Sequence, residues 1–173
     1  MRLPYVPDPP ITRNSEEAKI LERVQPDVAD GWNSFLGAIR TRTSLPAAIQ
    51  ELIICRVAVL NGALFEWDHH APLLIDPGTS HEALNAVQDE NVDIIQKVNE
   101  GVLSPAARTV IRYTDAMTRN VSFHEGIFTA VQEFYNSQEI VGITATVAAY
   151  NCVSRFLVAL DVGEKQKESK IST

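Results

Sequence analysis

A carboxylate, Glu66, and two imidazoles, His69 and His70, interrupt the largely apolar helical pattern of the stretch ELIICRVAVLNGALFEWDHH. A carboxylate or an imidazole that is buried in an apolar helix loses its hydration, so it must be hydrogen-bonded or face a cavity. The first hypothesis is therefore a polar pocket that these groups line.

Glu66 and His70 are one helical turn apart, so on a helix they share a face, together with Ala63, and can touch one ligand. A carboxylate beside an imidazole selects the tautomer of the ring and increases its basicity, which lets it carry a proton near neutral pH. The alternative is a local pair whose members only satisfy each other. Glu51, taken alone, is equally typical of a solvated charge near the start of a helix.

A metal site fits the pattern less well. Glu66 and His69 have the Glu-x-x-His spacing of one half of a di-iron site in a helical bundle. The other half is missing, because His81 and His124 follow no glutamate at that spacing and have no second histidine at zinc-helix spacing. We therefore expect no bound metal.

The composition is typical of one soluble globular domain. A chain of 173 residues can bury one substantial core, and 45% apolar with 21% charged residues is ordinary. No apolar run reaches the roughly 18 to 20 residues that span a bilayer, so we expect no membrane partner. A formal charge of −7 without a Lys/Arg cluster disfavours nucleic acid as a partner. The proline-rich start, MRLPYVPDPPITRN, lacks the apolar segment of a secretory signal, which predicts a cytoplasmic protein.

The two cysteines, Cys55 and Cys152, lie far apart and inside apolar helical patterns. We expect both to be reduced packing residues rather than a disulfide. A nucleophilic role for Cys55 has little support, because nothing in the sequence places a base beside its thiol.

Helical spacing of apolar residues runs through the chain and no segment alternates with period two, which predicts an all-α bundle. We expect a single domain over residues 14–163, an extended arm at 1–13 and a flexible tail at 164–173. The last helix, from about 140 to 160, is apolar nearly all round and should be central or at a subunit interface. Whether Gly62 ends a helix or only bends it stays open. Capping and proline signals place helix starts at Asn14 or Ser15, Pro26, Ser44, Thr79 or Ser80, Ser104, Ser122 and Asn136.

Several of these motifs resemble a known family. The succession Glu51-Leu52-Ile53-Ile54, Asn61-Gly62, Phe65-Glu66-Trp67-x-x-His70 and Gly78-x-Ser80 resembles the carboxymuconolactone decarboxylase branch of the alkylhydroperoxidase D-like superfamily. The run EIVGITATVAAYNCVSRFLVALDV resembles the last helix of that family, with Tyr150-Asn151 followed by Arg155. The resemblance covers about Leu45 to Val162. It implies an alkylhydroperoxidase D-like helical bundle that forms a homo-oligomer, a trimer or a hexamer.

The peroxidase branch of that superfamily carries a glutamate, a Cys-x-x-Cys pair, and a histidine four residues after the second cysteine. Glu51 and His70 match the glutamate and the histidine, whereas Ala63 and Glu66 occupy the two cysteine positions. A thiol peroxidase needs a peroxidatic and a resolving thiol, so these two residues exclude that chemistry. Acid-base chemistry remains, because it needs only a proton donor and an acceptor.

The resemblance implies a cofactor-independent carbon–carbon lyase that decarboxylates a small unsaturated lactone or carboxylic acid. By analogy His70 would deliver or shuttle the proton, Glu66 would orient and polarise it, and Glu51 would support the relay. The residues expected to contact the substrate are His69, Trp67, Phe65, Arg56 and Arg155, although a salt bridge between Arg56 and Glu51 is the expected alternative.

Two other functions stay open. The same acid-base pair would serve an isomerase, a dehydratase or a cyclase on a larger conjugated substrate. For such a substrate Leu64, Phe65, Trp67 and Leu73 would supply an apolar lining. The third possibility is a non-catalytic oligomeric binding protein in which the glutamate–histidine pair is structural.

Overall fold

The computed structural model describes residues 26–75, 79–120 and 122–162, and within these ranges every regular element is an α-helix. The all-α class expected from the sequence is confirmed. The expected arm at 1–13, the helix expected to start near Asn14 and the tail at 164–173 lie outside the described residues. The helices are α2 (Pro26–Arg42), α3 (Ala47–Leu60), α4 (Leu64–Ile75), α5 (His81–Gln88), α6 (Ile94–Asn99), α7 (Pro105–Arg119), α8 (Glu125–Gln132) and α9 (Ser137–Leu160).

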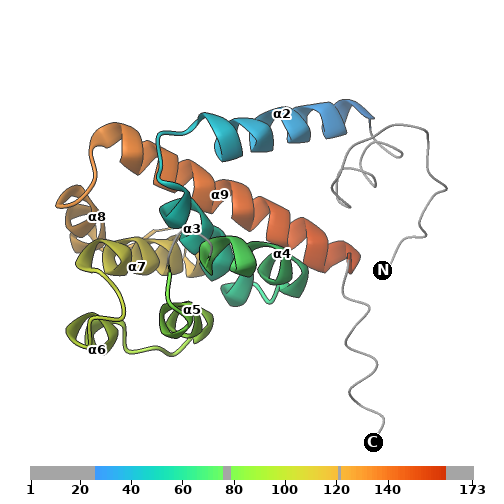
Figure 1. Ribbon diagram of the computed structural model, residues 1–173. Coiled ribbons are helices and arrows are strands. Elements are labelled where there is room, and N and C mark those ends of the chain that lie inside the picture. Colours follow the sequence, from blue (N-terminus) through green and yellow to red (C-terminus); the bar gives the residue numbers. More distant parts are fainter. Residues whose placement is uncertain (1–25, 76–78, 121, 163–173) are drawn as a thin grey trace, which may run out of the picture.

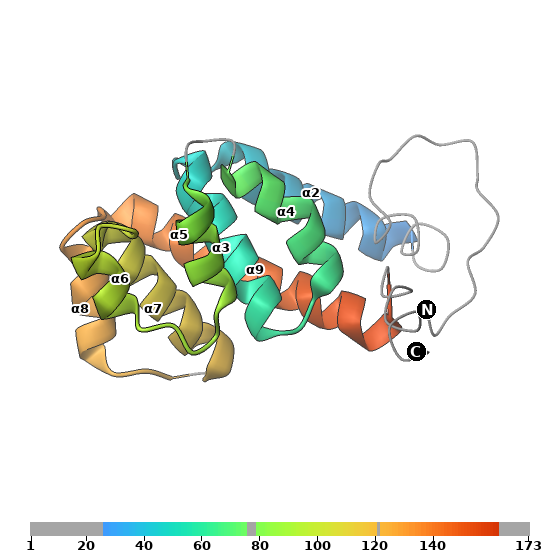
Figure 2. The same cartoon turned by 60° about the horizontal axis from the view of Figure 1, so that its bottom comes forward.

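The centre of the bundle is α3, which packs against α4, α5, α7 and α9. Residues 52–58 of α3 are all buried, as expected for a helix that is covered on every side. The longest helix, α9, runs along the molecule with α2 beside it, while α7 and α8 lie at one end and α5 and α6 at an edge (Figures 1 and 2). By length and composition α9 could cross a membrane, but half of its most apolar window is buried, as in a core helix.

Several helices begin where the sequence predicts. Ser80 caps α5 by accepting from Ala83 N at 3.1 Å, and Ser104 caps α7 ahead of Pro105. The start of α9 is a capping box, in which the Asn136 side chain accepts from Glu139 N and the Glu139 side chain accepts from Asn136 N.

Two predicted starts differ in detail. The cap of α8 is His124 rather than Ser122, because Nδ1 of His124 accepts from Gly126 N at 3.1 Å. A ring nitrogen can therefore replace the serine hydroxyl as the capping acceptor. Ser44 does not cap α3, which begins after Pro46 without a side-chain cap.

Gly62 ends α3 and does not merely bend it. Its φ of +64° is left-handed, and two hydrogen bonds, Gly62 N to Val59 O and Ala63 N to Ala58 O, complete a Schellman motif. The chain then reverses, so that α4 packs along α3 as the second arm of a helical hairpin. This turn decides which residues of α3 and α4 face each other.

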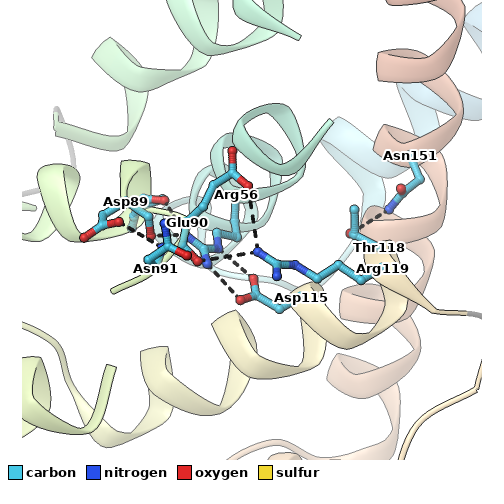
Figure 3. Close-up of polar contacts among 9 residues, drawn as sticks. Arg56, Asp89, Glu90, Asn91, Asp115, Thr118, Arg119 and Asn151 are labelled. Atoms are coloured by element: carbon cyan, nitrogen blue, oxygen red, sulfur yellow. Dashed lines mark hydrogen bonds and ion pairs between the residues drawn. The ribbon is translucent and has the colours of Figure 1, made fainter. Parts of the chain in front are cut away.

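The turn is also held to α9. Asn61 Nδ2 donates to Asn151 Oδ1 at 3.1 Å and to Ser154 Oγ at 2.7 Å. Asn151 in turn donates to Thr118 Oγ1 of α7 at 3.0 Å (Figure 3). A chain of side-chain hydrogen bonds therefore connects the hairpin with α7 and α9, and it satisfies polar groups that packing has removed from water.

A buried ion pair fixes α3 to α7 and to the end of α5. Arg56 is 1% exposed, and its Nε and Nη2 donate to the two carboxylate oxygens of Asp115 at 2.6 and 2.8 Å. Its Nη1 donates to the carbonyl oxygens of Val87 and Asp89 at 2.9 and 2.8 Å (Figure 3). A guanidinium in an apolar helix is tolerated here because four hydrogen bonds replace its water.

The left-handed backbone at Gly62 predicts a cost for any side chain there. We expect Gly62→Ala to lower the free energy of unfolding by about 1 kcal/mol, because an L-residue is strained at that φ. Gly37→Ala is the matched control, since Gly37 lies within α2 and an added Cβ meets nothing within 4 Å at either site. The control should be neutral or stabilising by about 0.5 kcal/mol. Urea unfolding measures the stability of both variants. An equal change in the free energy of unfolding for Gly62→Ala and Gly37→Ala would contradict the claim that the turn requires glycine at position 62.

The buried ion pair predicts a larger effect. Asp115→Ala leaves the Arg56 guanidinium buried without its carboxylate, so we expect a loss of about 3 kcal/mol or more in the free energy of unfolding. Glu90→Ala removes the carboxylate 3.9 Å from Arg119, in a pair that is half exposed, and should change stability by less than about 0.5 kcal/mol. A small effect of Asp115→Ala in the same urea titration would show that the pair is not structural.

Candidate functional site

The α3–α4 hairpin brings Glu51 and His70 into contact. Glu51 Oε2 lies 2.7 Å from His70 Nδ1, and the two side chains are only 15% and 11% exposed. An imidazole that donates its Nδ1 hydrogen to a carboxylate keeps Nε2 for exchange of a proton with a ligand. The sequence suggests Glu66 as the local partner of His70, and the hairpin supplies Glu51 as the closer one.

Glu66 lies near the other nitrogen of the same ring. Its Oε2 is 3.7 Å from His70 Nε2 and its side chain is 4% exposed, in agreement with the i and i+4 spacing. This distance is too long for a hydrogen bond but keeps the two groups within ion-pair range. The imidazole therefore stands between two buried carboxylates, with Glu51 at Nδ1 and Glu66 near Nε2.

Tyr150 of α9 completes the wall beside the histidine. Its ring meets the His70 ring edge to face, with centroids 5.4 Å apart. Arg40 of α2 donates from Nε to the Tyr150 hydroxyl at 2.8 Å. Burial raises the pKa of Tyr150 to about 12 although Arg40 lowers it, and the charges of Glu66 and Glu51 raise it further. The phenol is therefore protonated at neutral pH and remains a hydrogen-bond donor.

The sequence pattern assigns no role to Tyr150 and does not point to Arg40. Tyr150 entered only as part of the family resemblance, and nothing in the local pattern of α2 marks Arg40. The two residues are separated by 110 positions, so only the packing of α2 against α9 brings them together.

Cys55 lies close to the same carboxylates. Burial, followed by the charges of Glu51 and Glu66, raises the pKa of its thiol to about 12. The thiolate is the reactive form, so Cys55 is inert at neutral pH. Cys152 is also a free cysteine, but it is exposed, so the expectation that both cysteines pack in the interior is wrong for Cys152.

His69 and His70 point to different surroundings. The His69 ring is exposed, its Nδ1 lies 2.7 Å from Phe65 O within the same helix, and its centroid is 4.2 Å from that of Phe65. His70 therefore belongs to the buried cluster and His69 to the surface of α4. Phe65 and Trp67 are half-buried against the core, which leaves each of them partly accessible.

Neither arginine expected near the substrate belongs to the cluster. Arg56 pairs with Asp115 and not with Glu51, because α7 packs on the side of α3 that carries Arg56. Its four hydrogen bonds leave little capacity for a ligand. Arg155 donates to the side chain and to the carbonyl oxygen of Asn151, one turn earlier in its own helix. The cation that the structure places beside Tyr150 is Arg40.

The spacing of Glu66 and His69 does not build a metal site. Glu66 is 3% exposed, whereas His69 is exposed on the outer side of α4. Within the described ranges no three histidine, cysteine or acidic side chains meet as a metal ion would require.

Solved structures share this fold. A protein of unknown function from Agrobacterium tumefaciens, described as a candidate antioxidant defence protein AhpD, has a TM-score of 0.68 and 17% identity, and the likeness covers 82% of this chain and 92% of that one. A variant of the debrominase Bmp8 with bound 2,3,4-tribromopyrrole has a TM-score of 0.67 and 15% identity, over 83% and 73%. An uncharacterized peroxidase-related protein from Silicibacter sp. TM1040 has a TM-score of 0.70 and 13% identity, over 84% and 73%. At these identities the likeness concerns the fold alone, and it confirms the expected AhpD-like bundle.

The sequence comparison gives the family. No curated protein matches the chain. Residues 26–116, which include the whole α3–α4 hairpin with Glu51, Glu66 and His70, match the carboxymuconolactone decarboxylase family. This match covers more than half of the sequence, and the chain therefore belongs to the carboxymuconolactone decarboxylase family.

Proposed function

We propose that the protein is a cofactor-independent carbon–carbon lyase that decarboxylates a small unsaturated lactone or carboxylic acid. The observation that carries the proposal is the 2.7 Å contact between Glu51 Oε2 and His70 Nδ1 in a nearly buried setting. A buried carboxylate–imidazole pair orients one ring nitrogen for proton transfer, and proton transfer is the step that such a decarboxylation requires of the protein.

The reaction needs one proton for each carbon dioxide released. The bond between the substrate carbon and its carboxylate breaks, the electron pair passes into the conjugated carbonyl, and the carbon then takes a proton. His70 Nε2 is the donor in this proposal, and the ring regains its proton from solvent. Glu51 holds the ring through Nδ1, and Glu66, 3.7 Å from Nε2, orients and polarises the ring from its other side.

Tyr150 and Arg40 extend the proposal to the substrate carbonyl and carboxylate. The Tyr150 hydroxyl accepts from Arg40 and, because the phenol is protonated, can donate to a carbonyl oxygen that gains charge. Arg40 brings a positive charge to this side of the cluster, where the carboxylate of the substrate would be attracted. This assignment replaces Arg56 and Arg155, which are engaged elsewhere.

A second candidate is proton transfer on a larger conjugated substrate. Leu64 and Leu73 of α4 are 47% and 49% exposed, and Phe65 and Trp67 are only half-buried, so α4 carries accessible apolar surface on the helix that bears His70. The structure of the debrominase Bmp8 variant, which shares the fold, contains a conjugated ring compound. A panel that includes conjugated aromatic acids beside lactone acids separates the two candidates.

Assembly into a homo-oligomer stays a prediction.

Substitution of the proton-transfer residues tests the first candidate. On a panel of unsaturated lactone acids, we expect His70→Ala to lower kcat by at least about a hundredfold, because the proton donor is lost. Glu51→Gln and Glu66→Gln keep the shape of the side chain but remove its charge. Each should lower kcat by about tenfold or more. Release of carbon dioxide is the measurement, and Glu90→Gln on the surface is the control. Unchanged turnover in His70→Ala would exclude the mechanism. If the parent protein turns over no substrate of the panel, the result would instead favour the third possibility, a non-catalytic binding protein.

The thiols provide an independent test against peroxidase chemistry. With a pKa of about 12, Cys55 is thiolate to roughly one part in ten thousand at pH 8. We expect the Cys152→Ser variant to show no fast reaction with a thiol reagent until it is unfolded, and to consume no peroxide in the presence of a dithiol reductant. At pH values below the pKa, each increase of one pH unit raises the thiolate fraction tenfold. The labelling rate of Cys55 should therefore rise steadily from pH 8 to pH 10. Rapid labelling at pH 8 would contradict the assignment.

A further inference from the structure

An open hollow is lined by residues from the second half of α7 and by Ile127 of α8. These two helices pack against each other (Figures 1 and 2). The volume of the hollow is about 290 Å³, near the lower limit of pockets that hold small ligands. A much smaller cavity, of about 10 Å³, shares Arg112 and Ile127 with it and adds Arg108. The lining of the large hollow is Arg112, Asp115, Ala116, Arg119, Asn120 and Ile127. We call the two together the α7–α8 hollow.

The α7–α8 hollow is positive although the chain has a formal charge of −7. Arg108, Arg112 and Arg119 follow at spacings of four and seven, which places them along one face of α7. The one carboxylate in the lining, Asp115, accepts from Arg56 through both oxygens, so its charge is offset from the interior side (Figure 3). Three arginines thus follow one another along one face of α7, and two of them, Arg112 and Arg119, line the large hollow.

The arginines are weakly engaged by the protein itself. Arg108 Nε is buried, and no acceptor for it exists among the described residues. Arg119 Nη2 donates to Glu90 O at 3.4 Å and lies 3.9 Å from Glu90 Oε2 (Figure 3). Both side chains are about half exposed, so these long contacts are weak. Within the described ranges no hydrogen bond or ion pair involves the exposed side chain of Arg112. Guanidinium groups in such a state keep donors available for an added acceptor.

We propose that the α7–α8 hollow binds the oxyanion of a small molecule, a phosphate or a carboxylate group, through Arg112 and Arg119. Guanidinium forks match the paired oxygens of both groups. Ile127 and Ala116 offer apolar contact to the rest of the molecule. This site is built from α7 and α8, whereas the proton-transfer cluster is built from α2, α3, α4 and α9. Oxyanion binding and the proposed decarboxylase activity are therefore independent of each other and are tested separately.

Calorimetric titration of the full-length protein with inorganic phosphate, and separately with benzoate, tests the site. We expect saturable binding of at least one probe at low ionic strength, weakening as sodium chloride is added. Arg112→Gln should weaken that binding at least tenfold, because a charge-assisted contact is lost. The probe that binds more tightly identifies the oxyanion as phosphate or carboxylate.

Arg42→Gln is the matched control, because it removes an equally exposed arginine from the last turn of α2. It should leave the affinity unchanged, and circular dichroism should show that all variants are equally helical. The absence of saturable binding for both probes, or equal weakening in Arg42→Gln and Arg112→Gln, would overturn the proposal. A change of molecular mass on addition of the probe, seen by light scattering, would overturn it in favour of a subunit interface.

Discussion

The hydrogen bond between Glu51 Oε2 and His70 Nδ1 is the interaction on which the site depends. It joins two helices across a turn, and it requires that both side chains leave bulk water, which costs free energy unless each finds a partner. The Schellman turn at Gly62 sets the register of the hairpin, so that residues nineteen apart in sequence meet. Loss of the turn would therefore disturb the contact between Glu51 and His70 as well as the packing of α4.

Several polar side chains of α3 and of the turn that follows it are compensated by contacts with other helices. Gln50 donates to Ile39 O at the end of α2, Arg56 is held by Asp115 of α7, and Asn61 bonds to α9. These contacts leave α3 with neighbours on all sides, which explains why a helix that carries a carboxylate and a guanidinium can be the centre of the core. They also hold rigid the helix that presents Glu51, as a preorganised acid-base site requires.

By the sequence resemblance, Ala63 and Glu66 stand at the positions of the two cysteines of the peroxidase branch. Ala63 is buried in the turn and carries no reactive group, and Glu66 places a carboxylate close to His70 Nε2. The remaining thiol near the cluster, Cys55, has a pKa of about 12 because it is buried beside two carboxylates. Glu51, Glu66 and His70 therefore lie together beside a buried thiol that is protonated at neutral pH.

The sequence by itself determined the helical class, most helix starts and the face shared by Glu66 and His70, because caps and 3.6-residue periodicity are local properties. It could not determine that Glu51 pairs with His70, that Arg56 pairs with Asp115, or that Arg40 reaches Tyr150, because each contact joins helices whose relative register is set by packing. Likewise, only the tertiary structure shows that His70, and not His69, faces the interior. Adjacent residues on a helix differ by about 100° in direction, and only the position of α3 shows which direction is the interior.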